Sequence, residues 1–361
     1  MSEWKEYAFG DVAELLYGKG LKESERRPGN IPVYGSNGII GFHNESLVKG
    51  PGVIIGRKGS VGEIRYSESD FYPIDTTYYL DLKSGNDIKF FYYNLLTLQL
   101  NDMNSHSAVP GLNRKDVYSL KIPLPLIPEQ RAIASVLSSL DDKIDLLHRQ
   151  NKTLEDMAET LYRQMFIENK HQGWEDGYLQ DEFDFTMGLS PPGESYNEAG
   201  LGIPLFQGNA DFQFRFPTKR IYTTDPRRFA EKYDTLISVR APVGAQNMAR
   251  EKCCIGRGVA AFIYKKNSQY YTYTYFKLRS LMKEIQTFND EGTVFGSINK
   301  GDFEKIVITI PPSDSIDNFQ DQVKPIDDKI ILNSDQVRTL ENLRNMLLPK
   351  LMSGEMRVKY D

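Results

Sequence analysis

The stretch IPLPLIPEQRAIASVLSSLDDKIDLLHRQNKTLEDMAETLYRQMF, residues 122–166, decides the fold of this chain. From Pro128 onward apolar side chains recur every seven residues, in two rows that alternate at spacings of four and three, which is the pattern of a coiled-coil helix. Proline followed by glutamate suits the first turn of such a helix. The rows are Ile133, Leu140, Leu147, Leu154 and Leu161, and Leu137, Ile144, Asn151, Ala158 and Met165.

The C-terminal segment repeats this pattern less regularly, because Asn333 and Arg344 interrupt its rows. Two apolar stripes in one chain predict an antiparallel helix pair, with helices from a partner covering what remains. Asn151 and Asn333 either fix the register of the pair or face solvent at a frayed seam. The positions expected to form the helix and partner interface are Leu137, Leu140, Ile144, Leu147, Leu154, Leu161, Ile330, Val337, Leu340 and Leu347.

The chain is built twice. Asp141-Asp142-Lys143-Ile144 returns as Asp327-Asp328-Lys329-Ile330, and VIIGRKGSVG at 53–62 is answered by TLISVRAPVG at 235–244. The two halves share a plan and differ in their loops, which indicates one scaffold that reads two different targets. We expect globular domains at 1–127 and 171–311 and helices at 128–170 and 312–361.

The globular halves have the pattern of mixed domains. Short β-branched runs bounded by turn residues predict small twisted sheets, at 52–55, 63–66, 236–239, 259–264 and 306–310. Aromatic clusters at 90–93 and 270–276 are interpreted as core packing and not as base-stacking surfaces. The predicted fold class is therefore α+β: two mixed α/β domains separated by two long antiparallel coiled-coil helices, in a pseudo-twofold repeat.

Composition is that of an ordinary soluble protein, with 361 residues, 40% hydrophobic and 26% charged. No apolar run approaches the ~20 residues that span a bilayer, and the start lacks a signal-peptide pattern, so we expect a cytoplasmic protein without a membrane partner. Cys253 and Cys254 are adjacent, which favours buried thiols over a disulfide or a zinc site. A net charge of −5 argues mildly against nucleic acid but leaves room for a basic groove.

Catalytic and metal-binding motifs are absent from the sequence. There is no Walker lysine loop, no His-Glu-x-x-His and no Gly-x-Ser-x-Gly. Residues 190–193, SPPG, resemble an amino-methyltransferase signature but lack its aromatic residue. Asp141-x-Lys143 and Asp327-x-Lys329 resemble part of a nuclease site, and we interpret them as solvated helix charge. We therefore expect neither an enzyme nor a metal site.

Several segments resemble the conserved regions of the specificity subunit of type I restriction-modification enzymes. They are residues 122–166, the tail NLRNMLLPKLMSGEMRV at 342–358, YGSNGIIG at 34–41, GRKGSVG at 56–62 and SAVPGLNRKDV at 107–117. The resemblance covers the whole chain. The second half departs from it, because Ile310-Pro311-Pro312 is followed by SDSIDNFQDQV and not by Pro-Glu-Gln.

The resemblance implies a non-catalytic, DNA-binding subunit in a phage-defence system. Each globular half would read one half of an interrupted site in double-stranded DNA, and the helices would set the gap and dock two modification subunits. The modification subunits would bind S-adenosylmethionine, so this chain would bind no cofactor itself, and a restriction (motor) subunit would complete the enzyme. The alternatives are a related combined methyltransferase-nuclease system and a coiled-coil adaptor without DNA readout.

Candidate DNA contacts follow from the chemistry of base edges and phosphates. Arginine pairs best with guanine and Asn or Gln with adenine, while Lys, Ser and backbone amides position phosphates. For Asn37 a plain turn is an equal alternative. The candidates are Lys22, Arg26, Arg27, Tyr34, Ser36, Asn37, Arg57, Lys58, Ser60, His106 and Ser107 in the first half, and Gln207, Asn209, Arg215, Lys219, Arg220 and Arg240 in the second.

Overall fold

The computed structural model describes residues 4–103, 111–169, 174–288 and 296–359. The chain divides into two compact units: unit 1 contains residues 1–148 and 335–361, and unit 2 contains residues 149–334. Each unit therefore contains one globular domain together with a part of both long helices. The chain has two tryptophans, Trp4 in unit 1 and Trp174 in unit 2.

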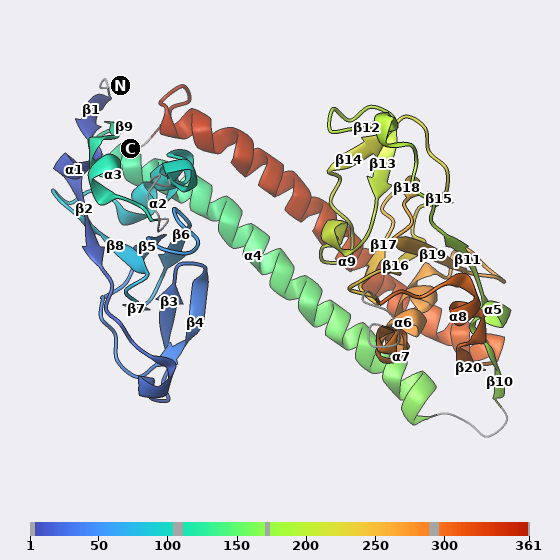
Figure 1. The fold of residues 1–361 in the computed structure, drawn as a ribbon. Coiled ribbons are helices and arrows are strands. Elements are labelled where there is room, and N and C mark those ends of the chain that lie inside the picture. Colours follow the sequence, from blue (N-terminus) through green and yellow to red (C-terminus); the bar gives the residue numbers. More distant parts are fainter. Residues whose placement is uncertain (1–3, 104–110, 170–173, 289–295, 360–361) are drawn as a thin grey trace. The chain divides into compact units, whose positions relative to one another are not determined.

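Both long helices are present, although the second ends at Met352 and not at the predicted residue 361. Helix α4 runs over Ile127–Arg163 and continues in a π-helical turn, Gln164–Glu168. Helix α9 runs over Ser313–Met352, so the irregular start of the second helical segment does not prevent it from forming (Figure 1). Gly354, at φ +76°, follows the end of α9 and turns the tail away from the helix axis.

The helices pair in antiparallel fashion inside each unit. In unit 1, Ile144 and Leu147 of α4 pack with Val337 and Leu340 of α9. In unit 2, Tyr162 of α4 packs edge-on against Phe319 of α9, with ring centroids 5.5 Å apart. Of the ten predicted interface positions, the structure buries Leu137, Ile144, Leu147, Ile330 and Val337 and half-buries Leu140, Leu154, Leu161, Leu340 and Leu347.

The interpretation of the two Asp-x-Lys pairs as solvated helix charge is wrong for the aspartates, although Lys143 and Lys329 are exposed as expected. Asp141 is half-buried and accepts hydrogen bonds from Tyr93 Oη (2.7 Å) and Arg344 Nη1 (2.9 Å). Asp327 is fully buried in unit 2 and accepts a hydrogen bond from Thr272 Oγ1 at 2.9 Å. Both carboxylates are held by partners far away in sequence, which no local pattern reveals.

Asn151 and Asn333 are both buried in unit 2, 1% and 0% exposed, so the solvent-facing alternative is wrong. Asn151 Nδ2 donates to Ser334 Oγ at 3.3 Å. Asn151 Oδ1 and both amide atoms of Asn333 make no hydrogen bond with the described residues. Buried polar groups without partners cost stability, and a slipped pairing would also lose the bond between Asn151 and Ser334, which disfavours it.

Replacing Asn333 with leucine should raise the free energy of unfolding of unit 2 by about 1–3 kcal/mol, because it removes two unpartnered buried groups. Asn151→Leu should gain less, because it also removes the bond to Ser334. Urea unfolding in a Trp4→Phe background, where Trp174 fluorescence reports unit 2, measures the change. Asn318→Leu, on an exposed position of α9, is the control. A destabilised Asn333→Leu variant would show that this amide is satisfied in solution.

The globular domain of unit 1 is built from three small sheets. A four-stranded sheet has the order β2-β8-β5-β6, and a three-stranded sheet has the order β4-β3-β7. A third sheet pairs β1 (Lys5–Ala8) with β9 (Lys121–Leu124). The other strands and α-helices are β2 (Ala13–Tyr17), β3 (Ile31–Gly35), β4 (Gly38–His43), β5 (Gly52–Gly56), β6 (Ile64–Ser67), β7 (Tyr72–Pro73), β8 (Thr77–Leu82), α1 (Phe9–Val12), α2 (Ile88–Thr97) and α3 (Arg114–Ser119).

Unit 2 repeats the first sheet with the order β11-β19-β16-β17 and replaces the second with five strands, β12-β14-β13-β18-β15. Its strands are β10 (Glu175–Tyr178), which pairs with β20 (Val307–Ile310), and β11 (Phe183–Met187), β12 (Tyr196–Asn197), β13 (Ile203–Phe206), β14 (Ile221–Thr223), β15 (Phe229–Ala230), β16 (Thr235–Ser238), β17 (Gln246–Met248), β18 (Cys253–Ile255) and β19 (Val259–Tyr264). Its helices are α5 (Leu179–Glu182), α6 (Tyr271–Ser280), α7 (Met282–Thr287) and α8 (Lys300–Lys305).

The cores confirm two interpretations made from the sequence. Phe90, Phe91 and Tyr93 are buried in unit 1, and residues 271–276 are buried in unit 2, so both aromatic clusters are core packing. Cys253 and Cys254 are buried free thiols. Within the ranges that the structure describes, no helix is both long and apolar enough to cross a membrane.

The tail after α9 is fastened to the beginning of unit 1. Arg357 Nε and Nη2 donate to Glu129 Oε1 and Oε2 at 2.5 and 2.7 Å. The Arg357 guanidinium also lies 5.5 Å from the ring centre of Trp4. The Glu129 side chain is 0% exposed, so this two-point ion pair is closed to solvent on the carboxylate side.

Candidate nucleic-acid interface

Four connecting segments of unit 1 meet at the ends of β2, β3, β5 and β8. We call residues 17–19, 35–37, 57–63 and 74–76 cluster 1. The Arg57 amide donates to the Thr76 carbonyl at 2.9 Å, and the Ile74 amide donates to the Tyr34 carbonyl at 2.9 Å. Because backbone bonds join the segments, cluster 1 has a fixed frame that presents the side chains at its tips.

An exposed aromatic ring lies among cations in cluster 1. Tyr17 is 49% exposed, and the guanidinium carbons of Arg57 and Arg114 lie 5.1 and 4.9 Å from its ring centre. Arg57 Nη2 also donates to the Asp75 carbonyl at 2.7 Å. Sequence reasoning missed Tyr17 and Arg114, although Arg114 lies in the NRKDV segment quoted above. Stacked arginines retain their charge and donors, which suits contact with phosphates and bases.

Tyr78 is buried and packs against the ring of Tyr17. Its hydroxyl donates to the Leu112 carbonyl at 3.1 Å, and its ring lies 5.1 Å from that of Tyr17. Burial, followed by its hydrogen bond with Tyr17, raises the pKa of Tyr78 to about 12, while Arg57 and Arg114 oppose the shift. The phenol therefore stays neutral at physiological pH and keeps its donor.

Four of the predicted polar residues of the first half lie on cluster 1. Lys58 and Asn37 are exposed, and Ser36 and Ser60 are half-buried. A Cβ added at Gly59, whose φ is +77°, would lie 3.2 Å from Ser36 Oγ. The glycine-rich loop and the β3–β4 turn are therefore in contact, and a small residue at position 59 permits it.

The basic loop predicted at 22–27 lies beside β4. Lys22 and Arg27 are exposed, and half-buried Arg26 donates from Nη1 to the Ile40 carbonyl at 2.8 Å. His106 and Ser107 lie outside the described residues.

Two predicted contacts are wrong. Tyr34 is 7% exposed and its ring packs edge-on against Phe71 at 5.9 Å, so it is a core side chain. The Arg215 side chain is fully buried and forms ion pairs with Asp327 and Glu155. Arginine is common on DNA-binding surfaces, but this one neutralises buried carboxylates instead.

Unit 2 carries an equivalent cluster on the same backbone frame. We call residues 187–189, 207–211, 239–245 and 256–258 cluster 2. The Val239 amide donates to the Gly258 carbonyl at 2.9 Å, and the Gly256 amide donates to the Phe206 carbonyl at 2.8 Å. These bonds repeat the two that join the segments of cluster 1, which places Val239 where unit 1 has Arg57.

The segment 207–220 of unit 2 is held together by Asp211. Its carboxylate accepts from the Gln207 amide at 2.7 Å and from Arg220 Nη2 at 2.5 Å. Gln207, Asn209 and Arg220 remain exposed. The side chains of Gln207 and Asn209 can therefore reach a ligand while their backbone is fixed.

The cations of cluster 2 only partly match those of cluster 1. Exposed Arg240 stands where unit 1 has Lys58, whereas Val239 stands where unit 1 has Arg57, and exposed Arg257 where unit 1 has Asp75. Sequence reasoning missed Arg257, which lies between two glycines. Lys219 is exposed and forms an ion pair with Glu251. The two clusters therefore share a backbone and differ in the chemistry at their tips.

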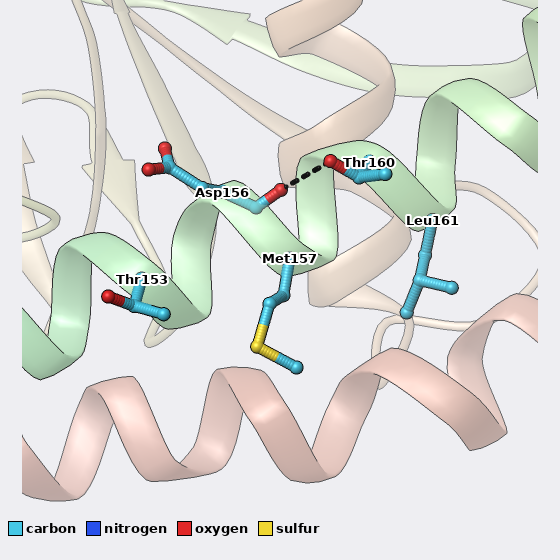
Figure 2. A pocket seen from close by; sticks show the side chains of 5 residues that line it. All are labelled: Thr153, Asp156, Met157, Thr160 and Leu161. Atoms are coloured by element: carbon cyan, nitrogen blue, oxygen red, sulfur yellow. Dashed lines mark hydrogen bonds between the residues drawn. The ribbon is translucent and has the colours of Figure 1, made fainter.

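A hollow of about 450 Å³ lies on α4 in unit 2, and none of its lining residues belongs to cluster 2. Figure 2 shows Met157 and Leu161 projecting from the same side of α4, and Met157 is 50% exposed. The lining residues are Thr153, Asp156, Met157, Thr160 and Leu161, which include a carboxylate and no cation. This surface suits an apolar protein side chain better than a phosphate backbone.

In the part of the chain that the structure describes, no group of three or more His, Cys, Asp and Glu side chains could hold a metal ion.

Comparison with known proteins identifies the family. The model of the type I restriction modification DNA specificity domain matches residues 1–156 and 172–342. A protein of Methanocaldococcus jannaschii named "Putative type I restriction enzyme MjaX specificity subunit" is 34% identical over 265 residues, covering 69% of this chain and 62% of its own length. The MjaIX specificity subunit of the same organism is 28% identical, covering 77% of this chain and 71% of its own length.

A solved structure confirms the fold. The crystal structure of the S subunit of a type I restriction-modification system from M. genitalium has a TM-score of 0.70 at 19% identity, covering 97% of this chain and 96% of that one. The predicted fold class, two mixed domains with two long antiparallel helices, is therefore correct.

Proposed function

This chain belongs to the type I restriction-modification DNA specificity family, and from that premise we propose that each unit reads one half of an interrupted site in double-stranded DNA. In this proposal the chain is the non-catalytic specificity subunit. The whole-complex activity rests on its partners: two modification subunits that bind S-adenosylmethionine and methylate adenine, and restriction (motor) subunits. Its proposed location is the cytoplasm, where the DNA lies.

The observation that carries the proposal is the pair of clusters with one backbone frame and different tips. Cluster 1 presents Arg57, Lys58 and the ring of Tyr17, while cluster 2 presents Gln207 and Arg240. Sequence is read by side chains on base edges, whereas backbone geometry sets where those side chains stand. Two readers that share a frame and differ at the tips would recognise two different half-sites.

The helices would serve the partners. The hollow around Met157 on α4 is apolar and lacks cations, and Leu332 of α9 is also half exposed to solvent. Exposed apolar side chains rimmed by polar groups are typical of protein interfaces. We assign these helix surfaces to the modification subunits, and the lengths of α4 and α9 to setting the gap between half-sites.

Single arginine substitutions test whether the units read separately. Arg57→Ala should relax recognition of one half-site by roughly 1–3 kcal/mol if it contacts a base, and Arg240→Ala should do the same for the other half-site. Methylation mapping of the assembled complex measures both. Lys49→Ala and Arg227→Ala are matched controls, since these exposed cations pair with Asp70 and Asp225 outside the clusters.

Two outcomes would count against this assignment. If either cluster substitution weakens binding equally on all sequences and flattens the salt dependence, that arginine contacts phosphate and not a base. If Arg57→Ala and Arg240→Ala both relax the same half-site, the units do not read separately.

A further inference from the structure

Arg215 is among the largest fully buried side chains of the chain. Its φ is +65°, in the left-handed region that residues other than glycine adopt at a cost of roughly 1–2 kcal/mol. The amide of Met248 donates to the Arg215 carbonyl at 2.9 Å, which holds the backbone in this conformation. The loop thereby turns a charged side chain toward the interior of unit 2.

The buried guanidinium joins three helices of unit 2. Arg215 Nη1 lies 3.6 Å from Glu155 Oε1 of α4, and Nη2 forms an ion pair with Asp327 Oδ1 of α9. Its central carbon lies 3.6 Å from the ring centre of Tyr275 on α6. Buried carboxylates are tolerated only when they are paired, so Asp327 depends on this cation, while Glu155 is shared between Arg215 and Arg279, whose Nη2 lies 3.6 Å from Glu155 Oε2.

The same loop carries the residues proposed to read DNA. Arg215 lies near the middle of the segment 207–220. The Thr218 amide donates to the Asp211 carbonyl at 2.8 Å, and the Asp211 carboxylate holds both the Gln207 amide and Arg220. The position of Gln207 on cluster 2 is thus connected, through Asp211 and the loop, to the anchor at Arg215.

Unit 1 solves the equivalent problem in a different way. Asp141, the repeat counterpart of Asp327, takes its arginine from α9, since Arg344 Nη1 donates to it at 2.9 Å. Its second hydrogen bond comes from Tyr93 of α2 at 2.7 Å. The described bonds of Asp141 therefore stay among helices, whereas those of Asp327 extend to a loop of the second reader.

We propose that Arg215 is a positioning residue of the second reader, which fixes segment 207–220 to α4 and α9 so that cluster 2 keeps one orientation on the helices. The inference rests on the proposed function of cluster 2 as the reader of a half-site. It assigns Arg215 no contact with DNA. Its effect on recognition is exerted through the placement of Gln207, Asn209 and Arg220.

A neutral replacement of the ion cluster separates positioning from stability. The triple variant Glu155→Gln, Arg215→Met, Asp327→Asn leaves no buried unpaired charge, so it should fold, as neutral replacements of buried ion clusters often do. Methylation mapping with the modification subunits should then show roughly ten- to hundredfold weaker discrimination at the half-site of unit 2. The half-site of unit 1 should be unchanged, and Trp174 fluorescence in a Trp4→Phe background reports whether unit 2 is folded.

The matched control is the double variant Asp141→Asn, Arg344→Met, which neutralises the counterpart pair in unit 1. Because that pair does not reach a reading loop, both half-sites should keep their discrimination. If the triple variant does not fold, Arg215→Lys decides in its place: lysine keeps the charge but cannot span both carboxylates, so the same loss at one half-site is expected.

A folded triple or Arg215→Lys variant that reads both half-sites as the unchanged chain does would overturn the proposal. Equal loss of discrimination in the Asp141→Asn, Arg344→Met control would overturn it too, because the effect would then be general. If the unchanged chain directs methylation to no two-part site, the proposed function fails, which is a separate and distinguishable result.

Discussion

Replacing Arg357 with methionine should destabilise unit 1 by about 3–5 kcal/mol, because it leaves the carboxylate of Glu129 buried without a cation. Glu129 is fully buried and receives two charge-assisted hydrogen bonds from Arg357. Breaking such a pair from one side is costly, since the carboxylate is fully buried and forms no ion pair with another described cation. Urea unfolding followed by Trp4 fluorescence in a Trp174→Phe background measures unit 1 by itself.

Two variants bracket this prediction. Lys350→Ala removes a partner of Glu355 that is exposed on both sides, and it should change stability by about 0–1 kcal/mol. The double variant Glu129→Gln, Arg357→Met should recover most of the loss, because no buried charge remains. A loss below about 1 kcal/mol for Arg357→Met would show that the tail does not hold unit 1 together.

Inserting one heptad into each long helix should lengthen the gap between the two half-sites while leaving both half-site sequences unchanged. Seven residues add about 10 Å of helix and preserve the phase of the apolar rows, with a drift of about 20°. The insertions belong between residues 148 and 149 of α4 and between 334 and 335 of α9, where the units divide. At about 3.4 Å per base pair, the gap should grow by about three base pairs.

A variant of unchanged length is the control for this experiment. Arg149→Ala with Lys152→Ala alters two exposed positions of α4 without changing its length, so the gap should stay the same. Methylation mapping reads out the gap in each case. If the inserted variant keeps the original gap, the helices do not set the spacing; if it reads different half-site bases, the readers depend on the helices in a way that the proposal does not allow.

The helices could be predicted from the sequence because a heptad pattern is local. Leu147 and Val337 are buried where the apolar rows placed them, and α9 begins at Ser313 although its first residues depart from the pattern of α4. The strands β5 and β19 were also visible as β-branched runs between turn residues. In each of these cases the side chains that decide the structure lie close to one another in the sequence.

The tips of the candidate interface could be predicted only in part. Arg57, Lys58 and Ser36 could be predicted, because glycine-rich and turn segments are recognisable from the sequence alone, and the structure brings these three residues together. Arg215 could not be placed, since its carboxylate partners lie 60 and 112 positions away in the chain (215 − 155 and 327 − 215). Whether an arginine faces solvent or a buried acid is decided by such distant contacts.

The measurement that tests the account most directly is methylation mapping of the host genome with and without the gene for this chain. Two readers on one chain predict a single new motif with two short specified halves, separated by an unspecified gap of fixed length. That motif should disappear when the gene is removed and return with it. A continuous motif without a gap, or an unchanged methylation pattern in a host whose modification subunit is active, would contradict the claim that each unit reads its own half-site.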